Sequence, residues 1–149
     1  MSKRKKKAIY AGIFLDEESA EKLRSTSYLY KEFCHHCTIA FKPTAEQVKA
    51  LPMGEEVFLR TIRHGCDQKA QAVMVKTADV DSYLFPAGQK PHITISCAEG
   101  ISPVHSNELD FEEEIPAANQ MILRGRVGIF TGKDIQYTLE GTIYEEVES

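Results

Sequence analysis

The sequence lacks any apolar run of about 18 residues, the length at which a membrane-spanning helix becomes a candidate. It also lacks a secretory signal, because the apolar stretch 8–15 ends at Asp16 without a clear cleavage site. Cysteine is sparse, at positions 34, 37, 66 and 97, and without an export signal we expect reduced thiols. These features predict a cytoplasmic or nuclear protein with no membrane partner.

Basic residues are scarce outside one short segment. Residues 3–7 hold five of the 18 lysines and arginines, so residues 8–149 carry 13 basic and 22 acidic side chains, a net charge of −9. Such a charge disfavours a broad surface for nucleic acid, and a protein of this kind that handles RNA would hold a short piece, such as an end. We expect residues 1–7 to form a flexible basic tail and residues 145–149 an acidic tail.

The remaining composition is that of one globular domain. The chain has 149 residues, of which 42% are hydrophobic and 27% charged, and this length can bury a core without disulfides or a structural metal. Hydrophobic patterning predicts helices from Asp16 to about Lys31 and from Thr44 to Leu51, with a helical turn near 106–109. It predicts strands over 8–15, 34–41, 56–64, 70–77, 92–97, 121–130 and 135–144. The order of these elements favours an α+β fold with mostly antiparallel sheet, in a single domain over residues 8–144.

Two of the predicted strands carry the same pair of polar residues. One reads His36-Cys37-Thr38-Ile39-Ala40-Phe41 and the other His92-Ile93-Thr94-Ile95-Ser96-Cys97. Strand side chains alternate between faces, so each strand presents an imidazole and a hydroxyl opposite an apolar face. By the same alternation Ser96 shares a face with His92 and Thr94, and His35 points away from the His36 face. Each strand is followed by a connector and a hairpin, which suggests two similar lobes.

These two His-x-Thr strands resemble those of the two-histidine (2H) phosphoesterase superfamily. The motifs His36–Phe41 and Pro91–Ser96 carry the resemblance, and within the superfamily the layout is most similar to the cyclic phosphodiesterase domain of fungal and plant tRNA ligases. The resemblance implies a bilobal fold, with two mostly antiparallel sheets around a central cleft and helices outside. The chain departs from the family in being short and in having Cys37 where an aliphatic residue is usual.

The resemblance also implies an activity. Many members open 2′,3′-cyclic phosphates of RNA ends or nucleotides to 2′-phosphates without a metal or other cofactor. Transferred residue by residue, His36 and His92 become the catalytic pair, and Thr38 and Thr94 the phosphate-binding residues. The expected partner is an RNA 3′ end or a small nucleotide with a cyclic phosphate, and we expect a monomer.

Independently of the resemblance, histidine and threonine suit the chemistry of this reaction. Ring opening needs a base that takes a proton from water and an acid that protonates the leaving oxygen, and histidine performs both roles near neutral pH. Hydroxyl donors aimed at the phosphorus centre stabilise the charge of the transition state. Candidate substrate contacts around the motifs are Lys42, Lys90, Tyr83 and Phe85. Tyr10 could also stack on a base, although core packing explains it as well.

Three other interpretations remain open. The two histidines could be half-buried strand residues satisfied by their neighbours. The domain could be a non-catalytic module that binds RNA ends or nucleotides. Cys34 and Cys37 form a Cys-x-x-Cys that could bind zinc with His64 and Cys66 or act as a redox dithiol, although a second Cys-x-x-Cys or His pair is missing and the motif enters a strand.

Overall fold

A computed structural model describes residues 8–78 and 90–137 of the chain. The predicted tails 1–7 and 145–149 and the candidate contacts Tyr83 and Phe85 lie outside these residues. Within the described part, no helix has the length and apolar character needed to cross a membrane.

The described residues form nine strands, two α-helices and two short 3₁₀ helices. The strands are β1 (Tyr10–Leu15), β2 (Lys31–Glu32), β3 (His36–Phe41), β4 (Glu56–Cys66), β5 (Ala70–Thr77), β6 (His92–Cys97), β7 (Glu113–Glu114), β8 (Ile122–Phe130) and β9 (Ile135–Gln136). The helices are α1 (Glu17–Arg24), α2 (Ala45–Lys49), η1 (Pro103–Glu108) and η2 (Ala117–Asn119). The structure confirms the mostly antiparallel sheet, the hairpin β4–β5 and the strand that begins at His92.

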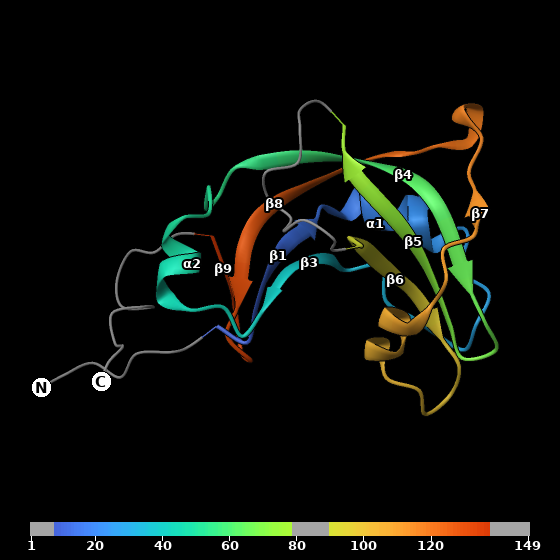
Figure 1. The fold of residues 1–149 in the computed structure, drawn as a ribbon, viewed down its shortest axis with the longest axis horizontal. Coiled ribbons are helices and arrows are strands. Elements are labelled where there is room, and N and C mark those ends of the chain that lie inside the picture. The colour runs from blue at the N-terminus through green and yellow to red at the C-terminus, as the bar shows by residue number, and fades with distance from the viewer. Residues whose placement is uncertain (1–7, 79–89, 138–149) are drawn as a thin grey trace, which may run out of the picture.

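The strands belong to one antiparallel sheet that closes on itself. The order is β7-β4-β5-β6-β3-β1-β8-β9, and β4 also pairs with β8, so the strands from β4 through β8 in this order form a ring. Figure 1 shows β1, β3 and β8 on one side of the molecule and β5 and β6 on the other, with β4 running over the top from the first group to the second. The two expected sheets are therefore joined into one, because β3 pairs with β6 and β8 pairs with β4.

The main core lies on one face of these strands. It contains fully buried side chains from strands distant in sequence, together with Ala20 and Leu23 of α1. The strand members of this cluster are Ile13, Cys37, Ile39, Leu59, Val73, Val75, Ile93, Ile95, Leu123 and Val127. Every second residue of β3 is buried, so the residues between them, His36 and Thr38 included, lie on the opposite face.

Both predicted helix starts are confirmed. The Asp16 carboxylate accepts a hydrogen bond from Ser19 N at 2.8 Å, and Thr44 forms a capping box with Gln47. The first helix ends at Arg24 rather than near Lys31. The hydroxyls of Ser25 and Thr26 donate to backbone carbonyls of the last helical turn. These carbonyls thus have hydrogen-bond partners without a continuation of the helix.

Candidate active site

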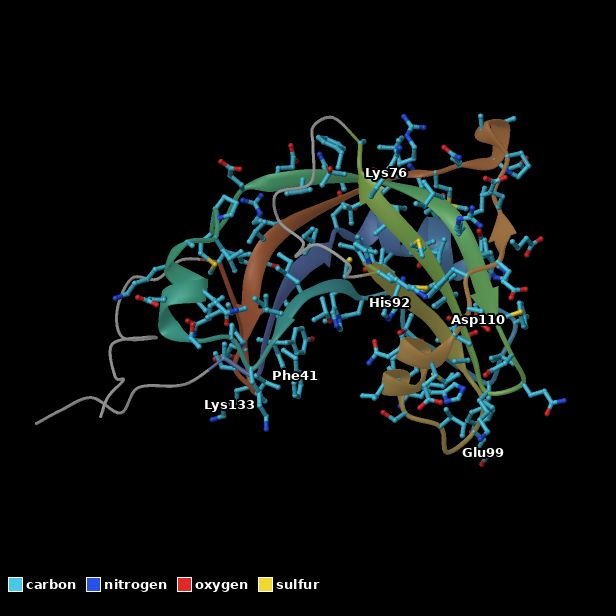
Figure 2. The ribbon with its side chains drawn as sticks, in the orientation of Figure 1. Phe41, Lys76, His92, Glu99, Asp110 and Lys133 are labelled. Carbon is cyan, nitrogen blue, oxygen red and sulfur yellow. The ribbon has the colours of Figure 1, made fainter. Side chains whose placement is uncertain are left out.

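The pairing of β3 with β6 brings the two His-x-Thr motifs together. Cys37 pairs with Ile93, and both side chains are completely buried in the core. In an antiparallel pair, the flanking residues face each other on the opposite side of the sheet, so Thr38 lies toward His92 and His36 toward Thr94. Figure 2 shows His92 near the middle of the molecule, where the two groups of strands meet. Residues from two distant segments thus share one polar patch.

His36 lies in an aromatic environment supplied by β1. The Tyr10 ring stacks on the imidazole with centroids 4.5 Å apart, and the Phe14 ring lies 5.7 Å away. The Tyr10 hydroxyl is 3.4 Å from Nδ1 of His36. Burial, together with smaller contributions from the charges of His35 and His92, lowers the pKa of His36 to about 4. His36 is therefore neutral at neutral pH and able to accept a proton.

His92 has a defined hydrogen-bond partner. Its Nδ1 lies 2.8 Å from the backbone carbonyl of Lys90, and because a carbonyl can only accept, Nδ1 carries the hydrogen. This leaves Nε2 as the nitrogen that exchanges a proton. The Phe111 ring lies 5.6 Å from the imidazole, and the Phe111 carbonyl accepts a hydrogen bond from Arg63.

The two threonines sit in different surroundings. The Thr94 hydroxyl is hydrogen-bonded to Ser106 of η1 at 2.9 Å, and Ser106 is completely buried. Thr38 pairs across the sheet with Gly12 of β1. A hydroxyl beside each imidazole gives the patch two groups that can donate to a phosphate oxygen.

Two positions differ from the sequence prediction. Ser96 does not share the face of His92 and Thr94, because the register between β5 and β6 shifts between Gln71 and Ala72. The Ser96 hydroxyl instead donates to Gln71 at 2.7 Å in a buried contact. A β-bulge of this kind moves the following residues to the other face of the strand.

The second difference concerns His35, which does not point away from His36. Its Nδ1 lies 3.0 Å from Nδ1 of His36. Cys34 has a positive φ of 52°, which turns the chain before β3 begins and breaks the alternation on which the prediction depended.

Of the two lysine candidates among the described residues, Lys42 lies away from this patch and Lys90 reaches it. Lys42 follows the far end of β3, roughly 20 Å along the strand from His36, and lies over the exposed Phe41 ring. Lys90 approaches through its backbone carbonyl. The proposed zinc ligands are not brought together, since no group of three or more potential metal ligands occurs among residues 8–78 and 90–137.

The sequence interpretation missed His35, Ser106 and Phe111 as neighbours of the motif residues. Ser106 and Phe111 belong to the segment after β6, in which only a helical turn was expected. Their approach depends on how that segment folds back over β5 and β6, and no local pattern indicates such a contact. Tyr10 was noted as an aromatic residue, but its stacking on His36 follows from the β1–β3 register.

Comparison with known proteins gives a fold and no family. No family model matches the chain, and no curated protein matches its sequence. Among solved structures, a crystal structure of a fungal RNA kinase is similar with a TM-score of 0.50 and 17% identity over 92% of this chain. The matched region spans 47% of the RNA kinase chain, about half its length. This likeness concerns the fold, which the chain shares with part of an RNA-modifying enzyme.

Proposed function

We propose that this protein is a metal-independent phosphodiesterase that opens 2′,3′-cyclic phosphates of RNA ends or nucleotides to 2′-phosphates. The observation that carries the proposal is the Cys37–Ile93 pairing, which sets His36 and His92 on one polar face with a threonine beside each. The two His-x-Thr motifs resemble those of 2H phosphoesterases, which supports the proposal. The similar fold of an RNA kinase adds support for a role in RNA processing.

In the proposed reaction His36 is the base. Its lowered pKa keeps it neutral, so Nε2 can take a proton from water while the water oxygen bonds to phosphorus. The bond from phosphorus to the 3′ oxygen then breaks. His92, protonated at Nε2, transfers that proton to the 3′ oxygen and leaves a 3′-hydroxyl and a 2′-phosphate. The Lys90 carbonyl at Nδ1 stabilises the protonated ring, and Thr38 and Thr94 donate to the phosphate oxygens.

Turnover of a cyclic-phosphate substrate by histidine variants tests this proposal. We expect His36→Ala and His92→Ala each to lower kcat by roughly 100-fold or more, as the loss of an acid or base does. The assay uses adenosine 2′,3′-cyclic phosphate and an oligoribonucleotide with the same end, with ³¹P NMR to locate the product phosphate. His64→Ala, which removes an imidazole bonded to Glu113 instead, should keep wild-type activity.

Circular dichroism establishes that each variant is folded. Full activity of folded His92→Ala would refute the proposal. Tight binding of the substrate by the wild-type protein without any turnover would identify a non-catalytic module instead.

A further inference from the structure

A second imidazole lies against the ring that we propose as the base. Nδ1 of His35 and Nδ1 of His36 are 3.0 Å apart, with ring centroids separated by 5.2 Å and ring planes at 88°. A hydrogen bond between two imidazole nitrogens requires that one carry a hydrogen and that the other accept it. The two Nδ1 atoms therefore share one hydrogen. If His36 carries it, Nε2 of neutral His36 has no hydrogen; if His35 carries it, Nε2 of neutral His36 is protonated.

The backbone holds His35 in this position from both sides. Cys34 N donates to the Thr94 carbonyl of β6 at 2.9 Å, and Leu15 N of β1 donates to the His35 carbonyl at 3.1 Å. Between these contacts, buried Cys34 adopts a positive φ of 52°. Such a conformation is costly for a residue with a side chain, and it persists where surrounding contacts fix it, often at functional sites.

The groups around Nδ1 of His36 differ in charge and in their ability to accept a hydrogen bond. Tyr10 is the other group at this nitrogen, and burial raises its pKa to about 12, so it remains a neutral phenol. His92, across the strand pair on β6, acts on His36 through its charge. Burial also lowers the pKa of His35, so it is neutral at neutral pH and its Nδ1 is able to accept.

We propose that His35 is a positioning residue, which accepts a hydrogen bond from the Nδ1–H group of His36. Nε2 of His36 then carries no hydrogen and can take a proton from the attacking water. This inference depends on the proposed function, in which His36 is the base. His35 makes no contact with the reacting atoms in this arrangement. When His36 takes the proton from water at Nε2, the existing Nδ1 hydrogen bond to His35 spreads the new positive charge.

The arrangement has a consequence at low pH. Protonated His35 carries a hydrogen on both nitrogens, so its Nδ1 no longer accepts. It then donates to Nδ1 of His36, which forces the hydrogen of His36 onto Nε2 and blocks the base. Removal of the His35 acceptor is expected to have the same effect on the tautomer at every pH.

Two substitutions at position 35 separate hydrogen bonding from packing. His35→Asn keeps an acceptor oxygen near the position of Nδ1, whereas His35→Phe keeps a ring of similar size and removes the acceptor. The control is His64→Phe, which replaces an imidazole outside the patch. The proteins are labelled with ¹⁵N-histidine, and the tautomer of His36 is read by NMR without substrate.

The wild-type protein and His35→Asn should show the hydrogen of His36 on Nδ1, and His35→Phe should show it mainly on Nε2. In parallel, kcat/KM of His35→Phe should fall by roughly 10-fold or more at neutral pH through kcat, with His35→Asn restoring most of the loss. In the plot of kcat/KM against pH, the acidic limb should shift along the pH axis in His35→Phe and remain at its wild-type position in His64→Phe.

An unchanged His36 tautomer in folded His35→Phe, with unchanged kcat/KM, would overturn the inference. Failure of the proposed function looks different, because the wild-type protein itself would then not turn over any of the cyclic phosphates.

Discussion

At the residue scale, the hydroxyl hydrogen of Thr94 has two acceptors in the proposed mechanism, the Ser106 oxygen and a phosphate oxygen. In the structure it donates to the hydroxyl of the buried Ser106 at 2.9 Å. Hydroxyl hydrogens rotate, so in the proposed complex with substrate Ser106 can become the donor and Thr94 can turn its hydrogen toward a phosphate oxygen. Ser106 thereby keeps a partner in both states, and the Thr94 oxygen is held at a fixed place.

Substitution at position 94 measures this contribution. Thr94→Val keeps the side-chain shape and removes the donor, and it should cost about 1–3 kcal/mol of transition-state stabilisation in kcat/KM. Thr94→Ser keeps the donor and should lie close to wild type. Steady-state kinetics at neutral pH measures both. Equal kinetics of Thr94→Val and the wild-type protein would remove Thr94 from the mechanism.

At this scale, the sequence allowed the prediction of residues in regular strand and not of those at irregularities. His36 and Thr38, and likewise His92 and Thr94, follow the two-residue alternation and share a face. Ser96 and His35 do not, because a bulge near Ile95 and the positive φ of Cys34 reverse the alternation. Neither irregularity involves glycine or proline, the residues that usually mark such sites in a sequence.

At the scale of elements, the approach of β1 to β3 depends on Gly12. A Cβ atom at this position would lie 2.8 Å from the Cys37 carbonyl oxygen, closer than real Cβ atoms come to backbone. Gly12 also follows the register shift between the two strands and pairs with Thr38. A side chain here therefore has to displace the strand that carries His36 and Thr38.

The variant Gly12→Ala should accordingly affect both stability and turnover. We expect a loss of about 1–3 kcal/mol in the free energy of unfolding, measured with urea, because the strands must separate. The displacement of Thr38 should also lower kcat. Gly100→Ala is the contrast: no atom lies within 4 Å, but φ is +80°, so it should lose stability through backbone strain and keep its kcat.

The predicted elements were most accurate where local signals mark both ends. Asp16 and Thr44 are capping residues, and their helices begin where expected. The end of α1 was placed too late, because the segment after it is held by a distant residue. Gln71 of β5 donates to the Thr26 carbonyl at 2.8 Å and accepts from Tyr28 N, contacts that connect the segment to the sheet.

At the scale of the whole molecule, the buried imidazole links stability to pH. The folded-state pKa of His36 is about 4, below its ordinary 6.5, so the unfolded chain binds this proton more readily. The stabilisation is fully present above about pH 6.5 and is lost as the pH falls toward 4. Burial lowers the pKa of His35 as well, which adds to the dependence in the same direction.

We therefore expect the free energy of unfolding to fall by on the order of 2 kcal/mol between pH 7 and pH 4.5 from His36 alone. Urea denaturation at several pH values measures this. His36→Gln, which does not titrate, should show a correspondingly smaller decrease. The same decrease in both proteins would show that His36 titrates normally and is not held neutral by its surroundings.

The closed arrangement of strands was beyond prediction from sequence. The pairings of β8 with both β1 and β4 join residues more than 60 positions apart, and no local pattern indicates which strands meet. The repeated His-x-Thr layout favoured two sheets. What it could not indicate is that β8 fills the gap between them.

The position of β8 has a consequence for biosynthesis. β1, β3, β4, β5 and β6 are all made before Ile122–Phe130 emerges from the ribosome, yet β1 and β4 have no shared neighbour until that strand arrives. Between the synthesis of β4 and that of β8, the nascent chain thus carries two exposed strand edges, which invites pairing with other chains. Truncation before Ile122 should yield an aggregating fragment rather than a smaller folded domain.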